Sequence, residues 1–190
     1  MKKVIMVMCA AVLAGTTVVA APVLAEEAKP ASTVISGYVQ GGYTYNSNAS
    51  AGDENDLRWL DHKAGNFGLD LAEVIFQKDP AAGTAGFKVK LSTGETAKLI
   101  HSVGLGDDGQ DAFDVTEAFM SYTAAVGSGL RFDFGKMGTF IGAEVMEAKD
   151  NPNYSRSFLF NYAEPLTHTG LKVSYAFTDA VNAAVFLVNG

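Results

Sequence analysis

The chain has 190 residues, a formal net charge of −7 at pH 7 and a single cysteine. The acidic balance argues against a nucleic-acid partner, because binding to a phosphate backbone requires a basic surface. One cysteine cannot form a disulfide within the chain, so we expect no disulfide to support the fold.

The first 25 residues have the pattern of a secretory signal peptide. Lys2 and Lys3 precede an interrupted apolar stretch, and Val23 and Ala25 lie at the positions that signal peptidase recognises. An uncleaved membrane anchor is the alternative, but the stretch is shorter than the roughly 20 residues that a spanning helix requires. We therefore expect removal of residues 1–25. Both lysines and the cysteine then leave, so 12 basic residues face 21 acidic ones, a balance of −9.

The remaining chain has no apolar run long enough for a transmembrane helix. An exported chain of this kind is either soluble or crosses the membrane as a closed barrel, because only a barrel or a helix satisfies every backbone group in lipid. We expect residues 26–33 to be a flexible periplasmic lead. Residues 34–190 are expected to form the strands.

Alternation of apolar and polar residues is the main signal after residue 33. Residues 34–45 have an apolar face and a mostly polar face, as a strand does. In residues 67–77 the phase changes, which predicts a β-bulge near Ala72 and Glu73. About seven strands are expected, at residues 34–45, 67–77, 86–91, 114–122, 129–136, 169–177 and 181–188.

The connections between these strands are alternately long and short. Transmembrane barrels have long outer loops and short periplasmic turns, whereas a soluble sandwich has no reason to alternate in this way. The predicted fold class is therefore all-β, an antiparallel transmembrane β-barrel. Because bacterial single-chain barrels have an even number of strands, we expect residues 34–190 to be the N-terminal portion of a larger barrel.

Charged residues occupy the polar face of two predicted strands. Phe132 and Phe134 alternate with Arg131 and Asp133, and Lys172 lies on the polar face of a later strand. We expect the two phenylalanines to face lipid. The three charged residues are expected to face a water-filled lumen, which solvates them.

The connection at residues 135–170 combines charges of both signs with aromatic residues. A long connection inside a compact domain is usually functional or disordered, and aromatic content argues against disorder. We expect a structured loop that folds over or into the barrel mouth. Opposed charges at a narrow point set selectivity, although the same charges could simply pin the loop to the wall. The candidate pore-constriction residues are Lys136, Glu144, Glu147, Lys149, Asp150 and Arg156.

The same connection carries a resemblance to a known family. The residues that carry it are Asp150 to Ser157, Leu159-Phe160, Pro165 and His168-Thr169-Gly170, with Gly135-Lys136, Ile141-Gly142, Glu144 and Glu147 before them. They resemble the OmpL-like β-barrel porin-2 family of Gram-negative outer membranes, and the resemblance extends over residues 36–190. It implies an outer-membrane diffusion channel in contact with lipid and lipopolysaccharide.

No residue pattern indicates an enzyme or a cofactor. The acidic clusters at residues 53–61 and 107–111 lack the calcium-loop spacing, and no two histidines have a metal-ligand spacing. His168 is expected to be a hydrogen-bonded structural residue. No nucleophile elbow or phosphate loop occurs. We expect no catalytic residue, no metal and no cofactor.

The leading functional hypothesis is a porin for passive diffusion of small hydrophilic solutes, with residues 135–170 as the constricting loop. The expected location is the bacterial outer membrane, and homo-oligomerisation is left open. Two alternatives remain. One is a barrel without a channel that acts as an adhesin or a structural protein. The other is an exported β-sandwich that binds carbohydrate.

Overall fold

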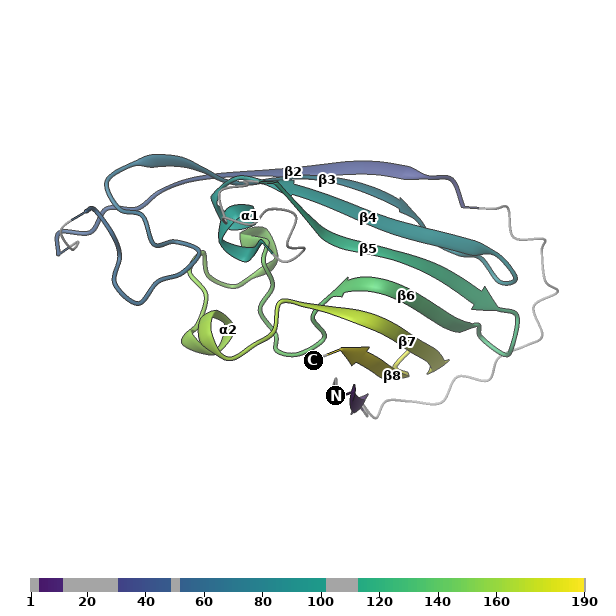
Figure 1. Cartoon of the computed structure of the whole chain (residues 1–190). Coiled ribbons are helices and arrows are strands. Elements are labelled where there is room, and N and C mark those ends of the chain that lie inside the picture. Colours follow the sequence, from purple (N-terminus) through teal and green to yellow (C-terminus); the bar gives the residue numbers. More distant parts are fainter. Residues whose placement is uncertain (1–3, 12–30, 49–51, 102–112, 190) are drawn as a thin grey trace.

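A computed structural model describes residues 4–11, 31–48, 52–101 and 113–189 (Figure 1). In these residues the chain forms one antiparallel sheet with a few short helical segments. The strands are β1 (Val4–Ala11), β2 (Val34–Tyr43), β3 (Phe67–Lys78), β4 (Ala85–Thr93), β5 (Phe113–Ala124), β6 (Leu130–Gly138), β7 (Thr167–Thr178) and β8 (Val181–Asn189). The helical segments are α1 (Glu95–Ile100), η1 (Ala148–Asp150) and α2 (Phe158–Tyr162).

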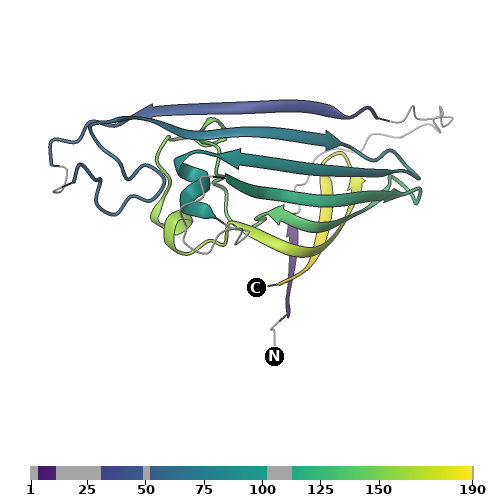
Figure 2. The same cartoon turned by 45° about the horizontal axis from the view of Figure 1, so that its top comes forward.

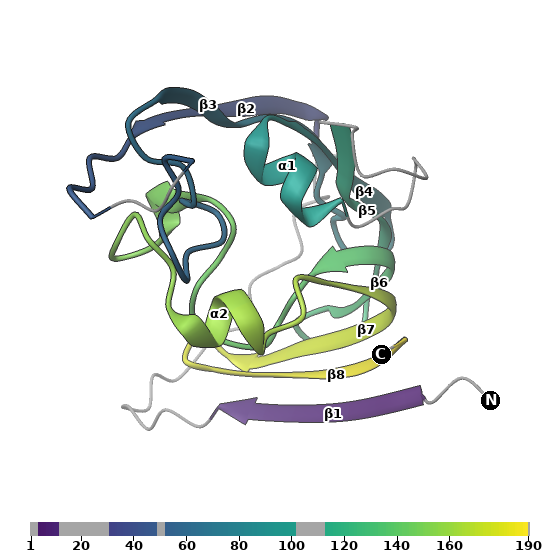
Figure 3. The same ribbon diagram turned by 60° about the vertical axis from the view of Figure 1, so that its left-hand side comes forward.

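The strands from β2 to β8 form an up-and-down meander, and β1 lies at its far edge beside β8, which gives the order β1-β8-β7-β6-β5-β4-β3-β2. The short turns lie at one end and the long connections at the other (Figure 2). The sheet curls into a trough that holds α1 and α2 on its concave side (Figure 3). Within the described residues the edge strands β1 and β2 do not pair with each other, so the sheet is not closed.

The strand β1 lies inside the predicted signal peptide. It pairs with the outer edge of β8, from Val4 opposite Asn189 to Ala11 opposite Asn182. Unpaired backbone groups at a sheet edge accept any strand of suitable register. If residues 1–25 are removed on export, as we expect, this edge of β8 is open to another strand. The predicted cleavage position after Ala25 lies outside the described residues.

All seven predicted strands are confirmed as β2 to β8. At the majority of strand ends the observed bound differs from the predicted one by one or two residues, and at the others the two agree. The two-residue extensions occur in the strands from β4 to β7, which continue past the end of the alternation. They do so because the backbone pairing with a neighbouring strand does not depend on which side chains alternate.

Bulges change which residues face inward. Gln40 pairs with Leu71 and Gly41 with Leu69, so Asp70 is the extra residue in β3. The predicted bulge therefore exists, but it lies slightly before Ala72 and Glu73. A second bulge places Thr116 between the pairs Lys90–Glu117 and Leu91–Val115. Sequence alternation did not reveal it, because both residues that it brings to the buried side, Thr116 and Glu117, are polar.

The outer surface of the sheet is apolar and ends in aromatic residues. Near the long connections Phe67 is 88% exposed, and its ring centroid lies 4.7 Å from that of Tyr43. Near the short turns the rings of Tyr175 and Phe177 lie 4.9 Å apart. Such an outer face, with aromatic residues at both ends of the strands, is typical of contact with lipid. No helix formed by the described residues is long and apolar enough to span a membrane.

The long connections meet inside the trough in one small apolar core. Leu60 from the first connection packs with Met146 and Phe160 from the last, and Phe160 is only 1% exposed. Leu99 and Ile100 of α1 pack against the same core. Each fully buried side chain of this size contributes roughly 1.5–3 kcal/mol, so the connections support one another.

The bounds of the last long connection and the structure of residues 95–100 differ from the sequence prediction. The last long connection spans residues 139–166 instead of 135–170, because β6 and β7 remain paired as far as Gly138 and Thr167. Residues 95–100, expected in a polar connection, form α1. With only 6 residues, α1 is too short to show a helical period in the sequence. We refer below to residues 139–166 as the inner loop.

Candidate functional site

Strand β4 contributes two lysines to the concave side of the sheet. Lys88 and Lys90 alternate with apolar residues in β4, and the register places Lys90 opposite Glu117 of β5. Glu73 of β3 is buried beside them. Four charged side chains from three neighbouring strands thus lie on the same side of the sheet.

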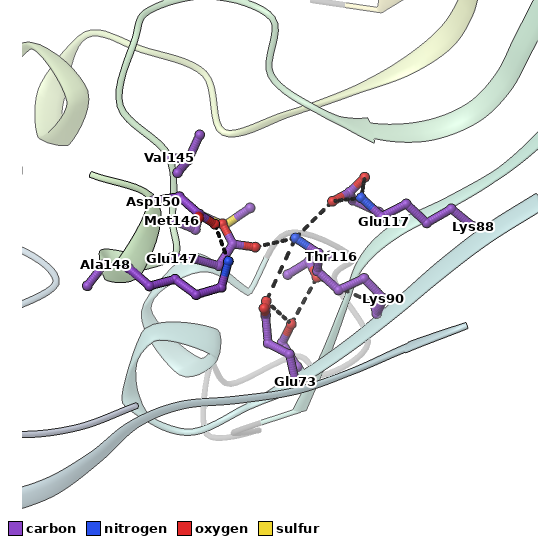
Figure 4. A network of polar contacts seen from close by, with 12 residues as sticks. Glu73, Lys88, Lys90, Thr116, Glu117, Val145, Met146, Glu147, Ala148 and Asp150 are labelled. Carbon is purple, nitrogen blue, oxygen red and sulfur yellow. Dashed lines mark hydrogen bonds and ion pairs between the residues drawn. The ribbon is translucent and has the colours of Figure 1, made fainter. Parts of the chain in front are cut away.

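These residues form a compact ionic cluster around Lys90 (Figure 4). Lys90 Nζ lies 2.9 Å from Glu117 Oε1 and 3.9 Å from Glu73 Oε1, and it donates a hydrogen bond to Glu147 Oε1. Lys88 Nζ lies 3.0 Å from Glu117 Oε2. Buried charges persist only when they are paired, and here three carboxylates surround two ammonium groups.

Glu147 belongs to the inner loop, so its contact with Lys90 joins this loop to the wall. Two further contacts join the same parts of the molecule. The backbone N–H of Ala148 donates to Gln40 Oε1 at 3.3 Å, and Tyr154 Oη donates to Asp70 Oδ2 at 2.5 Å. The inner loop starts at β6 and ends at β7, and yet it is attached to β2, β3 and β4. It therefore crosses the concave side of the sheet.

Other charges of the inner loop hold the loop itself together. Arg156 is 5% exposed, its Nε donates to the Val145 carbonyl at 3.1 Å, and its terminal nitrogens donate to the Met146 and Tyr154 carbonyls. Burial lowers the pKa of Arg156 below its usual value. Glu144 accepts a hydrogen bond from the Ser157 N–H at 3.0 Å. Ser157 in turn caps the N-terminus of α2.

The remaining candidate constriction residues have different surroundings. Lys149 and Asp150 are exposed and form an ion pair, and the hydrogen bond from Lys149 to Asp150 raises the pKa of the lysine. Lys149 Nζ also lies 5.4 Å from the centre of the Tyr38 ring. Lys136 lies against β5, where its Nζ donates to the Val115 carbonyl at 2.6 Å.

Arg131, Asp133 and Lys172, the residues expected to face the lumen, lie together in the structure. Arg131 Nε is 2.8 Å from Asp133 Oδ1, and Lys172 Nζ is 3.7 Å from Asp133 Oδ2. Ser121 of β5 donates to the same carboxylate at 2.6 Å. The three charges form a second ionic group on the concave side, nearer the short turns than the Lys90 cluster.

Cavities flank the contact between Lys90 and Glu147. One, of about 360 Å³, lies between the inner loop and the wall and extends to Phe140, Lys172 and Phe186. Another, of about 480 Å³, lies beside Tyr38, Lys149 and Asp150. Lys90 and Glu147 line both cavities. A third cavity, of about 580 Å³, continues from Phe140, Lys172 and Phe186 toward the short turns.

The cluster residues Glu73, Lys88, Lys90 and Glu117 were not among the candidate site residues. The alternation of Lys88 and Lys90 with apolar residues did indicate that both lysines lie on one face of a strand. Their partners lie on other strands, however, and only the register and the bulge at Thr116 bring Glu117 to Lys90.

No group of metal-ligating side chains occurs in the part of the chain that the structure describes. The acidic cluster at residues 107–111 lies outside that part. His168 is buried in β7, with its Nε2 3.2 Å from Thr139 Oγ1 and its ring stacked on Phe140. These contacts agree with the expected structural role of His168.

Comparison with known proteins gives one match. The family described as "Putative beta-barrel porin-2, OmpL-like" matches residues 32–190, which is most of the chain. No curated protein and no solved structure matches the chain. The match covers all the strands from β2 to β8, with their apolar outer face and charged inner face. The chain therefore belongs to the OmpL-like β-barrel porin-2 family, and this membership implies an outer-membrane location.

Proposed function

We propose that this protein is an outer-membrane channel for passive diffusion of small hydrophilic solutes and that the inner loop constricts it. The observation that carries the proposal is the crossing of the concave side by the inner loop. Glu147 of the loop meets Lys90 of the wall, and cavities lie on both sides of this contact. A solute that moves along the concave side passes charged groups at the narrowest point.

The charges around this contact suit a passage for polar solutes. Water screens a charge poorly in a narrow passage, so each group acts on a solute more strongly than at an open surface. The Lys90 cluster has one more carboxylate than ammonium groups, whereas two cations share Asp133 nearer the short turns. We propose that these opposite local excesses orient dipolar solutes and leave only a weak overall preference for one sign of charge.

A channel in the outer membrane requires export of the chain from the cytoplasm. We propose that residues 1–25 are a signal peptide that is cleaved on the way to the outer membrane. The supporting feature is the basic start followed by an interrupted apolar stretch. N-terminal sequencing of protein from outer membranes should begin at Glu26, and a start at Met1 would contradict the cleavage.

Conductance in planar bilayers tests the channel. The protein purified from outer membranes should give stepwise current increments in KCl, and a deletion of residues 149–154 should raise the size of each step. Glu147→Gln should shift the reversal potential toward anions more than Glu144→Gln, because Glu144 is bonded inside the loop. Lys136→Gln with Arg156→Gln should shift it toward cations, mainly through Lys136, because Arg156 is bonded inside the loop as Glu144 is. If neither the deletion nor any charge change alters conductance or reversal potential, the constriction lies elsewhere.

One observation favours the barrel without a channel as a second candidate. The long connections share an apolar core, Leu60 with Met146 and Phe160, which fills part of the mouth. A mouth that is completely filled would support an adhesin or a structural protein instead of a pore. The bilayer experiment separates the two, because such a barrel gives no current steps with or without the deletion.

A further inference from the structure

The tip of the inner loop is held in a specific place on the opposite wall. Tyr154 Oη donates to Asp70 Oδ2 at 2.5 Å, and Gln40 Nε2 donates to the same oxygen at 3.2 Å. Gln40 Oε1 in turn accepts from the backbone N–H of Ala148 at 3.3 Å and from Tyr38 Oη at 2.8 Å. One polar network on β2 and β3 thus holds the inner loop at two points.

The wall leaves room for this contact at Gly42. A Cβ atom at Gly42 would lie 2.3 Å from Tyr154 Oη and 2.5 Å from Asp70 Oδ2, so any side chain there would collide with both groups. The backbone of Gly42 does not need glycine, because its φ is outside the left-handed range. Space for the tyrosine is therefore the structural reason for glycine at this position. We call Gly42, Asp70 and Gln40 the tyrosine seat.

The bulge in β3 contributes to the seat. Asp70 is the extra residue in that strand, and the bulge turns its carboxylate toward the concave side, where Gln40 and Tyr154 reach it. Burial and the neighbouring Asp70 carboxylate raise the pKa of Tyr154. Its hydroxyl therefore stays protonated and continues to donate over the whole neutral range.

The contact in the seat is separate from the bonds that fold the loop. Arg156 and Glu144 bond to groups within the loop, whereas the Tyr154 hydroxyl bonds only to the wall among its contacts in the described residues. Loss of that hydroxyl should leave the loop folded and still held through Ala148 and Glu147, but its tip would no longer be fixed against Asp70 of β3. A hydrogen bond to a charged group changes the equilibrium between the docked and the released loop tip by roughly tenfold or more.

We propose that Tyr154 is the positioning residue of the constriction: its docking in the tyrosine seat fixes how far the inner loop reaches across the lumen, and so sets the width of the passage. This inference rests on the proposed channel function.

Single-channel recording with two matched pairs of variants tests it. Tyr154→Phe removes only the hydroxyl, and we expect a larger mean conductance and a several-fold rise in open-channel current noise. Tyr162→Phe, an exposed tyrosine of the same loop, should behave as the wild type. Gly42→Ala should reproduce the effect of Tyr154→Phe. Gly41→Ala should not, because a Cβ at Gly41 lies no closer than 3.4 Å to other atoms.

A double variant shows whether Gly42 acts through Tyr154. In the Tyr154→Phe background, Gly42→Ala should add little to the conductance and noise, because the contact between residue 154 and Asp70 that its methyl group would break is already lost. Asp70→Asn, which keeps an acceptor oxygen, should raise the noise less than Asp70→Ala. Equal behaviour of Tyr154→Phe and Tyr162→Phe would overturn the inference while leaving the channel function intact.

A second measurement does not depend on conduction. Ser155→Cys, next to the tyrosine and half-buried, should react slowly with a membrane-impermeant maleimide and faster in the Tyr154→Phe background. Heat-modifiable migration on gels would show that every variant is folded. If the wild type gives no current steps, the proposed function fails, and the labelling rates still report whether the seat holds the loop. Unchanged labelling rates would overturn the docking itself.

Discussion

Lys90 shows how a single residue can organise a charged interior. Its ammonium group is buried among three carboxylates from two strands and the inner loop. All three carboxylates are also buried, so Glu73 and Glu147 depend on this cation for a countercharge, whereas Glu117 also contacts Lys88. Lys149, in contrast, forms an exposed ion pair, for which water and salt leave only a small contribution.

Removal of Lys90 should therefore be costly. We expect Lys90→Met to lower the free energy of unfolding by about 3–5 kcal/mol, because it leaves uncompensated buried carboxylates. The double variant Lys90→Met, Glu147→Met should recover part of this loss, since Glu117 keeps its contact with Lys88. Lys149→Met should cost less than about 1 kcal/mol. Urea unfolding in lipid vesicles measures all three, and similar losses for Lys90→Met and Lys149→Met would contradict the role of the cluster.

The ion pair between Lys63 and Glu95 should make the stability of α1 depend on pH. The hydrogen bond from Lys63 lowers the pKa of Glu95 below its usual value of 4.5. A lowered pKa in the folded state means that the pair stabilises α1 fully above pH 4.5 and that this contribution is lost as pH falls through the lower value. The contribution is less than about 1 kcal/mol, because the Lys63 side chain is 54% exposed.

Hydrogen exchange of the α1 backbone amides measures this local stability. After correction for the intrinsic exchange rate, protection should decrease as pH falls below 4.5 in the wild type. In Lys63→Ala the decrease should be much smaller. An identical pH dependence in both proteins would show that the pair does not support α1.

At the scale of elements, β6 separates two environments by alternation alone. Phe132 and Phe134 belong to the outer face, and Arg131 and Asp133 belong to the ionic group on the concave side. The β-strand period of two residues makes the assignment sharp, because a shift by one residue would place both charges in lipid.

The two faces of β6 should therefore respond differently to substitution. Phe132→Arg should cost about 2–4 kcal/mol if the residue lies near the membrane midplane. Arg131→Ala should cost much less, because Asp133 retains its contacts with Lys172 and Ser121. Folding into vesicles measures both free energies. The reverse ranking would mean that the outer and inner faces of β6 are exchanged.

At the scale of the molecule, the two ends of the sheet differ in kind. The long connections and the helical segments lie at one end, and the short turns lie at the other (Figure 2). In outer-membrane barrels the long loops face the outside of the cell and the short turns face the periplasm. The family membership and the aromatic residues at both ends of the strands agree with a membrane-spanning barrel, and the lengths of the connections indicate which end faces outward.

Labelling of intact cells tests the orientation. Single cysteines at Gly52 and Asn153 should react with a membrane-impermeant reagent, because both lie in long connections. Cysteines at Gly83 and Asp179, in the short turns, should react only after the outer membrane is disrupted. No native thiol interferes if residues 1–25 are removed, because Cys9 is the only cysteine of the chain. Equal labelling at all four positions in intact cells would contradict the topology.

The strands and the two faces of the sheet could be predicted from the amino-acid sequence. Alternation with period two is a local property, so Phe132 and Arg131 could be assigned to opposite faces without knowledge of any neighbour. The lengths of the connections can also be measured along the chain, and their alternation predicted an antiparallel barrel. The mixed charges of the inner loop also identified it as a candidate constriction.

Which charges meet depends on how the chain folds. Glu147 pairs with Lys90 and Tyr154 with Asp70 over large separations in sequence, and no local pattern predicts contacts of this kind. The charged residues of the inner loop also have different partners, which the sequence does not distinguish. Arg156 and Glu144 bond within the loop, whereas Glu147 reaches the wall. The positions of Asp70 and Glu117 also depend on bulges, which shift one strand against its neighbour and are fixed by pairing.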